Sequence, residues 1–520
     1  PAAQPSGIIM MMSVIDRLFC ARILPKEILI KPSVIVTVFC LSFALHLSAS
    51  IFSEGRTHPD SDYQILEFAN FKVGNESNLT LPWEFFEQIR PALQPALAFV
   101  VHESVGNGEP FQTAFFLRLM SAVLGLASSW SLCFYAFRWL TERWAQYSLI
   151  MLTGFFWLLP VLNARFASET WAAAFLAICI VLVHRTCERE GQRRIGLAIV
   201  SGLSLAILFY LRFPVAFAIL GLGLWVLFIA RPGIRVLGGM MLGIVLGLTL
   251  NILIDYWFYE EWVITPINYF AANLIEGRAA GYGLDPWWYF IEKIFFLLVP
   301  PVSLFLMLLV VVAWVRKPKH VLTWVSVFFL VGHSLVGHKE TRFLFPVIYP
   351  LLIVGIIGAQ SLMSQTRGNY ERFKNKKIVK YAVFYFCIIN TMALLFMTFA
   401  PANQEAVIHK WIHENNTHHS FKLLTYQKHP YHDGRGMVSF FRSPKAQFLP
   451  INSADELNRA VNKDDLPVYV FVPSVYAPMA LRAQCPNLQL EVSALPSWLR
   501  QLDFGLWFSD LRIWSIFRCG

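Results

Sequence analysis

Residues 34–52 read VIVTVFCLSFALHLSASIF, a run with no Asp, Glu, Lys or Arg. A helix of about 20 mainly apolar residues is long enough to cross the hydrocarbon core of a bilayer. The run is long for the core of a cleavable signal peptide, so we interpret it as a retained membrane span. Similar apolar runs follow it along the chain, separated by short charged bursts.

The composition of the whole chain agrees with repeated spans. Its 520 residues are 56% hydrophobic and 15% charged, whereas soluble domains carry about 25% charged residues. We therefore expect an all-α polytopic membrane protein with about eleven transmembrane helices. The predicted spans lie near residues 33–53, 112–137, 145–162, 168–184, 195–211, 213–230, 236–254, 291–314, 321–337, 342–360 and 379–399.

The basic residues between the spans predict the orientation of the chain. With these spans, most Lys and Arg clusters fall on one side, which should be cytoplasmic. The net charge of +10 therefore reflects topology, and nucleic acid is not an expected partner. We expect a cytoplasmic segment at 1–32, a transmembrane domain at 33–400 with outer loops at 54–111 and 255–290, and a lumenal or periplasmic domain at 401–520.

The tail after residue 400 has the pattern of a small folded domain. VYVFV at Val468–Val472 predicts a buried strand, and the surrounding turns and polar patterning favour an α/β or α+β domain. Cys485 and Cys519 lie in this tail, where an oxidising compartment would allow a disulfide; the sequence leaves their pairing open. Its histidines fit no strong metal-binding template, so we predict no metal site.

Three carboxylates follow the first span within eight residues: Asp60, Asp62 and Glu67. If a helix starts at Ser61 with Asp60 near its cap, Tyr63 and Glu67 share one face and Asp62 lies elsewhere. A carboxylate at the membrane surface is suited to accept a proton from an attacking hydroxyl. A solvated helix start without chemistry is the alternative.

Two other outer stretches mix aromatic and polar side chains. Trp83 and Glu84 suit an interfacial helix, and the aromatic and amide residues of 255–290 suit either sugar binding or the aromatic belt of a membrane protein.

Charged residues also lie between two apolar runs, in His338-Lys339-Glu340-Thr341-Arg342. Charge at that depth is costly and is usually kept for a partner. Phosphate is a natural partner for Lys339 and Arg342, and Arg165 and Arg212 are further cations on the side where cations are disfavoured. Together they suit an anionic lipid headgroup.

These elements, in this order, resemble glycosyltransferase family 22, the dolichol-phosphate-mannose-dependent mannosyltransferases, and most closely those of glycosylphosphatidylinositol anchor assembly. The residues that carry the resemblance are His58, Pro59, Asp60, Gln64 and Glu67; Leu81–Phe85 with Arg90 and Pro95; the D-x-x-x-Y, TP-x-N and YG-x-x-PW pattern of 255–287; and His338–Pro350. Ser61 and Pro82 depart from the family pattern.

The resemblance implies a GT-C fold and an inverting transfer of mannose from a polyprenyl (dolichyl) phosphate donor to a lipid-linked glycan acceptor. Asp60, with Asp62 and Glu67, would be catalytic, and Lys339, Arg342 and Arg212 would bind the donor phosphate. The residues expected to bind donor or acceptor are His58, Gln64, Trp83, Glu84, Arg90, Asn268, Tyr282, Trp287, His338 and Glu340. No cofactor is required, and a divalent metal is possible without being implied.

Two alternatives remain open at this stage. One is a bacterial GT-C enzyme that uses another polyprenyl-phosphate sugar, and the other is a lipid or glycolipid transporter without chemistry. The expected location is the endoplasmic reticulum membrane in a eukaryote or the inner membrane in a bacterium, with membrane lipids as surroundings.

Overall fold

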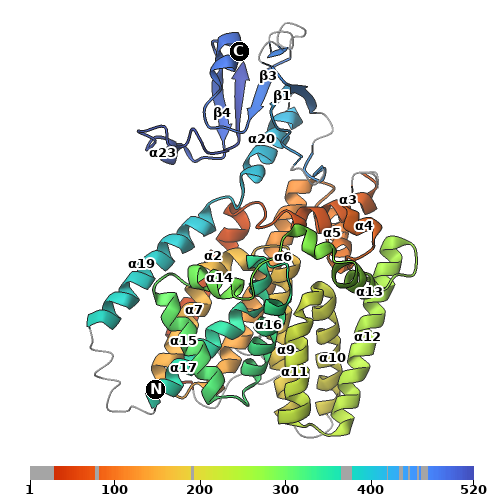
Figure 1. Ribbon diagram of the computed structural model, residues 1–520, viewed down its shortest axis with the longest axis vertical. Helices are drawn as coiled ribbons and strands as arrows, with labels where there is room; N and C mark the ends of the chain where they lie inside the picture. Colours follow the sequence, from red (N-terminus) through yellow and green to blue (C-terminus); the bar gives the residue numbers. More distant parts are fainter. Residues whose placement is uncertain are drawn as a thin grey trace, which may run out of the picture. The chain divides into compact units, whose positions relative to one another are not determined.

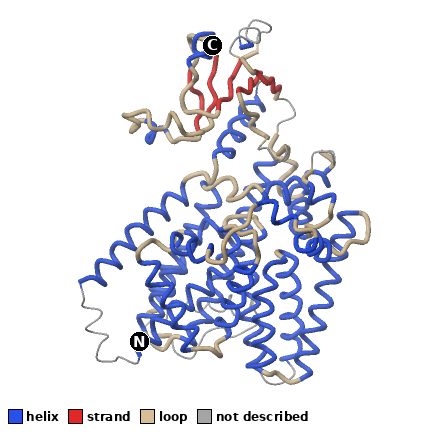
Figure 2. Tube along the Cα trace, viewed as in Figure 1, coloured by secondary structure: helices blue, strands red, loops and turns tan. Residues whose placement is uncertain are grey.

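A computed structural model describes most of the chain. It covers residues 28–75, 81–188, 193–364, 377–418, 420–432, 437–442, 446–453, 456–457 and 466–519. Nearly all of the expected cytoplasmic segment 1–32 lies outside these residues, as does the basic stretch 365–376. The described chain is helical except for one sheet near the C-terminus (Figures 1 and 2).

The chain forms two compact units, each assembled from separate stretches of sequence. The first contains the described parts of 1–50 together with 87–94 and 118–399. The second contains the described parts of 51–86, 95–117 and 400–520. The second unit therefore combines residues that follow the first span with the C-terminal tail.

Within the described residues, eight helical segments are long and apolar enough to cross a membrane. They contain α2 (Pro32–Phe52), α6 (Pro110–Ala136) with η3 (Phe137–Trp139), α9 (Ser168–Glu188), α10 (Arg193–Leu211), η4 (Phe213–Val215) with α11 (Ala216–Trp225) and η5 (Val226–Ala230), α12 (Ile234–Tyr259), η8 (Thr341–Val347) with α17 (Ile348–Ser364), and α19 (Lys377–Phe399). Each coincides with a span predicted from the sequence. The predicted class, a polytopic helical membrane protein, is confirmed.

The other three predicted spans form shorter helices. The stretch expected at 145–162 is divided into α7 (Arg143–Phe155) and α8 (Leu158–Asn163) by the extended backbone of Phe156. The stretch at 291–314 is divided into α14 (Tyr289–Leu297) and α15 (Val302–Arg316), with Pro300 and Pro301 between them. Proline lacks the N–H that a continuous helix would use there. Helix α16 (Val321–Leu335) is apolar and 15 residues long.

Helices α10 and α12 approach each other closely through glycines. A Cβ added at Gly243 of α12 would lie 2.0 Å from the carbonyl oxygen of Ile199, and one at Gly202 of α10 would lie 1.9 Å from that of Met240. Gly239 and Gly247 lie one turn on either side of Gly243, so small residues recur every fourth position. Such spacing is typical of membrane helices whose backbones touch.

Short helices complete the second outer segment of this unit. After α12 ends at Tyr259, the chain forms α13 (Thr265–Phe270), η6 (Ala271–Ile275) and η7 (Arg278–Tyr282) before it enters α14.

The second unit contains a five-stranded sheet in the order β2-β1-β3-β5-β4. Its strands are β1 (Lys422–Tyr426), β2 (Gln447–Ile451), β3 (Val468–Val472), β4 (Gln489–Ser493) and β5 (Ser515–Cys519). Strand β1 runs parallel to β2 and β3, and β5 runs antiparallel to β3 and β4. Strand β3 is the buried VYVFV strand that the sequence predicts.

Alternating side chains of the strands pack against helices on the two faces of the sheet. Leu423 and Phe471 lie in one buried cluster with Ile408 and Ile412 of α20 (Gln404–His418). Their neighbours Leu424, Val470 and Phe517 lie in another cluster, with Leu481 of α22 (Met479–Gln484). The predicted C-terminal α/β domain is therefore confirmed.

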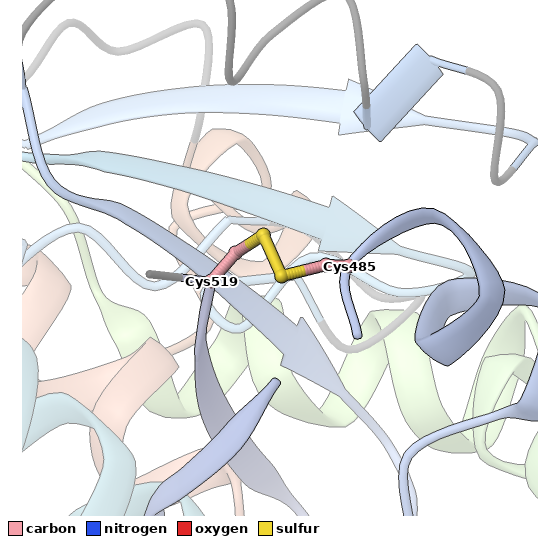
Figure 3. The surroundings of a disulfide bond; sticks show 2 residues. All are labelled: Cys485 and Cys519. Carbon is pink, nitrogen blue, oxygen red and sulfur yellow. A yellow bond between two sulfur atoms is a disulfide. The ribbon is translucent and has the colours of Figure 1, made fainter. Parts of the chain in front are cut away.

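A disulfide joins Cys485, directly after α22, to Cys519 at the end of β5 (Figure 3). The pairing that the sequence left open is present, and it links this helix covalently to the middle of the sheet.

The remaining elements of the second unit belong to the first outer segment or to the tail. They are η1 (Asp62–Leu66), α3 (Glu67–Val73), α4 (Trp83–Phe86), the greater part of α5 (Leu93–Glu103), the start of α6, and α23 (Ser497–Arg500).

The glycine contact between α10 and α12 predicts a position-specific loss of stability. Gly243→Leu should lower stability by about 1–3 kcal/mol, because the new side chain meets a backbone carbonyl that cannot rotate away. Gly238→Leu on the same helix is the matched control, since a Cβ there meets nothing within 4 Å. Thermal unfolding of the two purified variants in detergent measures the difference, and equal midpoints would contradict the proposed contact.

Candidate active site

The candidate catalytic segment begins with a tight turn into a helix. The backbone N–H groups of Ser61 and Asp62 donate to the carbonyl oxygens of His58 and Pro59, at 3.2 Å and 2.9 Å. The N–H of Asp60 donates to Nδ1 of His58 at 3.2 Å, and the same nitrogen lies 3.3 Å from Asp60 Oδ1. The imidazole thus fixes the backbone at Asp60, whose carboxylate is partly exposed.

The helix that follows begins with a π-helical turn, η1. The N–H of Glu67 donates to the carbonyl oxygen of Asp62, five residues earlier. A regular α-helix would place Asp62 and Glu67 on different faces. A π-helical turn holds more residues, so the two side chains lie closer to the same face. Burial raises the pKa of Glu67, and the negative charge of Asp62 raises it further.

Asp62 is buried and forms an ion pair with Arg56. Arg56 also lies 3.9 Å from Glu405 of α20. The predicted catalytic residue Asp62 is therefore engaged by a cation that sequence reasoning did not single out.

Glu67 is buried against the tail of the chain. Its Oε1 accepts the backbone N–H groups of Ser439 and Phe440 at 2.8 Å and 2.9 Å, and its Oε2 accepts the hydroxyl of Ser439. Asn70 donates to that hydroxyl oxygen at 3.1 Å. Burial raises the pKa of Glu67 to about 7, although the hydrogen bonds it accepts act in the opposite direction.

Two other predicted residues of this segment meet each other. The amide of Gln64 donates to Glu84 of α4 at 3.2 Å. This bond connects the two motif stretches of the first outer segment. Trp83 begins the same short helix and is half-buried.

In the first unit, one buried carboxylate contacts two of the predicted phosphate-binding cations. Oε1 of Glu169, at the start of α9, lies 3.3 Å from Arg212 and 3.1 Å from Arg342. Both guanidinium groups also lie over the ring of Phe343, at 5.0 Å and 5.6 Å from its centroid. The start of α9, the end of α10 and the start of η8 thus bring one carboxylate and two guanidinium groups together.

The histidine and glutamate of the same motif extend this cluster. Glu340 accepts from Nε of Arg342 at 2.6 Å and contacts Nε2 of His338 at 3.0 Å. The ring of Tyr282 lies 5.9 Å from that of His338. Four predicted residues are therefore brought together: His338, Glu340, Arg342 and Tyr282.

Lys339 is buried and turned toward backbone. Its ammonium donates to the carbonyl oxygens of Asp285, Val336 and Gly337. In this arrangement it joins the second outer segment to the loop after α16, and a phosphate would have to share it with these carbonyls.

The family-like residues of 255–268 hold a short backbone stretch, 87–92. Asp255 accepts the N–H of Ala92 at 2.7 Å and the hydroxyl of Thr265 at 2.8 Å. Tyr259 donates its hydroxyl to the carbonyl oxygen of Arg90 at 2.7 Å. These contacts fix the backbone around Arg90.

Two predicted binding residues lie at this stretch, and one lies apart. The amide of Asn268 lies 3.4 Å from the carbonyl oxygens of Glu87 and Gln88. The guanidinium of Arg90 lies over the ring of Tyr269, 5.7 Å from its centroid. Trp287 is exposed and packs edge to face with Trp288.

Sequence reasoning missed Arg56, Glu169 and Ser439. The only signal for the first two was a charged residue close to a span on the outer side, and nothing marked Ser439. No group of three or more His, Cys, Asp or Glu side chains suited to a metal occurs among the described residues.

Comparison with known proteins identifies the family. The model of the Alg9-like mannosyltransferase family matches residues 37–431, which include Asp60, Glu169, Arg212 and Arg342. The chain belongs to the Alg9-like mannosyltransferase family. This is a family of glycosyltransferases, so the resemblance and the enzyme class predicted from the sequence are confirmed.

Individual relatives of this Alg9-like chain agree with the assignment. It is 25% identical over 354 residues to GPI mannosyltransferase 3 of Candida albicans, which covers 68% of this chain and 67% of that protein. It is 27% identical over 147 residues to the probable Dol-P-Man:Man(7)GlcNAc(2)-PP-Dol alpha-1,6-mannosyltransferase of Schizosaccharomyces pombe, which covers 28% of this chain and 27% of that protein.

A solved structure shows the same fold. The crystal structure of ArnT from Cupriavidus metallidurans bound to undecaprenyl phosphate superposes with a TM-score of 0.51 at 14% identity, covering 93% of this chain and 98% of that one. The GT-C fold predicted for this Alg9-like chain is confirmed.

The burial of Glu67 predicts a pH-dependent stability. Since its pKa is raised from 4.5 to about 7 in the folded protein, its contribution is fully present below pH 4.5 and is lost as pH rises to about 7. Glu67→Gln retains an oxygen acceptor but does not titrate. Unfolding midpoints between pH 4.5 and 8 should therefore fall more steeply with pH in the wild type than in this variant, and parallel curves would contradict the prediction.

Proposed function

We propose that this protein is an inverting glycosyltransferase that moves mannose from a polyprenyl-phosphate donor to a lipid-linked glycan or glycolipid acceptor. The observation that carries the proposal is the meeting of Arg212 and Arg342 at Glu169 in a chain of a mannosyltransferase family. Glu169 and Glu340 balance these two guanidinium groups in the structure, and a lipid phosphate would replace a carboxylate as their partner.

In the proposed reaction, the hydroxyl oxygen of the acceptor attacks the anomeric carbon of the donor sugar. The bond from that carbon to the phosphate oxygen breaks, and the phosphate leaves with the electron pair. Asp60 takes the proton of the attacking hydroxyl, and the configuration at the anomeric carbon is inverted. Arg212 and Arg342, with Lys339, stabilise the negative charge on the leaving phosphate.

The neighbouring carboxylates act through Asp60 in this proposal. Asp62, paired with Arg56, and Glu67, bonded to the tail, hold the helix on which Asp60 lies. His58 fixes the Asp60 backbone. The other predicted binding residues, Gln64, Trp83, Glu84, Arg90, Asn268, Tyr282, Trp287, His338 and Glu340, keep their proposed role as contacts of donor or acceptor.

The names of the relatives support the choice of substrates. They are GPI mannosyltransferase 3 and a probable Dol-P-Man:Man(7)GlcNAc(2)-PP-Dol alpha-1,6-mannosyltransferase. The Cys485–Cys519 disulfide supports a location of the second unit in an oxidising compartment, lumenal or periplasmic. A GT-C enzyme for a different sugar remains the second candidate, and supplying membranes with different labelled polyprenyl-phosphate sugars separates the two.

Asp60→Asn tests the proposed base. The variant keeps the size of the side chain but cannot accept the proton, so mannose transfer should fall by about 10²–10⁴-fold at normal expression. Glu491→Gln, which changes a carboxylate in a long surface ion pair with Arg518, is the matched control and should retain activity. Mannose transfer within a few-fold of wild type in Asp60→Asn would show that this residue is not the catalytic base.

Arg342→Gln tests the phosphate contact. Transfer should fall by about 10²–10³-fold, because a charge that stabilises the leaving group is lost. Inhibition by free polyprenyl phosphate should weaken in parallel, since that product retains the phosphate. Arg518→Gln is the control for loss of an exposed arginine. Unchanged product inhibition in Arg342→Gln would place the phosphate elsewhere.

A further inference from the structure

The C-terminal domain carries a group of exposed apolar side chains in one segment, residues 497–511, which we call the aromatic loop. They are Trp498, Leu502, Phe504, Leu506, Trp507 and Leu511. Phe504 and Trp507 are 86% and 72% exposed. Contiguous exposed apolar residues of this kind mark a binding surface in a folded protein.

The exposure results from a defined conformation of the loop. Asp503 accepts the N–H of Trp507 at 2.6 Å and that of Phe508 at 3.4 Å, which closes a turn. The hydroxyl of Tyr476 donates to the same carboxylate at 2.6 Å and so attaches this turn to the rest of the domain. These bonds engage the carboxylate of Asp503, and the large apolar side chains remain exposed.

The connectivity of the chain links the second unit to the membrane. The second unit is joined directly to three candidate membrane helices: α2, which ends at Phe52, α6, which begins at Pro110, and α19, which ends at Phe399. Only four residues separate Phe399 from the start of α20 at Gln404. The unit is therefore tethered to the bilayer through all three of its chain segments.

The chemistry of the loop matches an interface between lipid and water. Tryptophan is enriched where lipid headgroups meet acyl chains, and leucine and phenylalanine partition below it. Arg500 lies within the loop and Arg512 directly after it, and both are suited to contact lipid phosphates. The loop also contains Asp503, which accepts backbone N–H groups of its turn, and Asp510. Exposed apolar residues beside cations thus occur in a unit that is attached to a membrane.

We propose that the aromatic loop inserts into the bilayer surface on the side of the second unit and anchors the C-terminal domain there. The anchor is independent of the proposed catalytic residues, none of which lies in it. The anchor holds the C-terminal domain at the membrane surface, where lipid-linked molecules are found. This domain is linked to the Asp60 helix through Glu67.

Lipid contact is tested with a fluorescent probe in the full-length protein. The free cysteines, Cys40 and Cys387 among them, are replaced by alanine, and the disulfide is kept. A nitrobenzoxadiazole probe is attached to Trp507→Cys, and the protein is reconstituted in phosphatidylcholine nanodiscs with a shallow doxyl-labelled lipid. Ser453→Cys, an exposed position after β2 at the far edge of the sheet from β4, is the matched control.

The expected result is a blue-shifted emission at position 507 and quenching by the doxyl lipid at least three-fold stronger than at position 453. Equal and weak quenching at the two positions would overturn the proposal. A probe at position 507 that is shielded in native membranes but exposed in the nanodiscs would also overturn the proposal. That result would identify a protein partner, and not lipid, as the surface that covers the loop.

A second pair of variants, Phe504→Glu and Leu449→Glu, tests whether quenching depends on the apolar side chains of the loop and not on the label. The probe is placed at Ser509→Cys in the same loop, and Phe504→Glu is added. Quenching should fall by more than half, because a carboxylate resists entry into the acyl region. The same change at an exposed leucine of the sheet, Leu449→Glu, should leave it unaltered. Quenching that survives Phe504→Glu would contradict insertion through these side chains.

Discussion

The arrangement of the transmembrane unit depends on the pairing of charge where solvation is poor. Glu169 lies at the start of one helix, Arg212 follows another, and Arg342 lies in the turn before a third. An isolated ion buried at such a place would cost several kcal/mol, and removal of one partner leaves the others uncompensated. The shared carboxylate therefore fixes the relative positions of three helix ends.

A comparable constraint operates in the second unit, where Glu67 is buried among donors. Two backbone N–H groups and one hydroxyl of residues 439–440 converge on its carboxylate. Charge-assisted bonds of this kind are stronger than neutral ones and depend on geometry. Asp60 lies at the start of the helix held in this way, two residues before the π-helical turn. The position of this side chain is thus controlled from the tail of the chain.

The sequence alone was sufficient for the fold and the family. Apolar runs separated by basic clusters predicted the long helices, because bilayer thickness imposes a length that any spanning helix must meet. The VYVFV strand and the motif residues from His58 to His338 were equally readable. Local breaks were not: the interruption at Phe156 and the π-helical turn after Asp62 depend on packing that no local pattern records.

The partners of the charged residues were also beyond sequence reasoning. Glu169 and Arg342 are 173 residues apart by number, and Glu67 and Ser439 are 372 apart. A carboxylate near a span or a serine in a tail has no distinguishing pattern, so long-range pairing has to be observed. For the same reason, Lys339 was interpreted only as a phosphate ligand, although backbone carbonyls occupy its ammonium.

The separation of Glu67 from Ser439 also has a consequence for biogenesis. Chains emerge from the ribosome with the N-terminal part first, so the Asp60 helix is made long before the residues that complete its surroundings. Until translation has passed Phe440, the carboxyl group of Glu67 lacks its hydrogen-bond donors and the second unit lacks its β-sheet. Maturation of this half of the molecule must therefore be a late event, and a chain released early would present an unfinished surface to quality control.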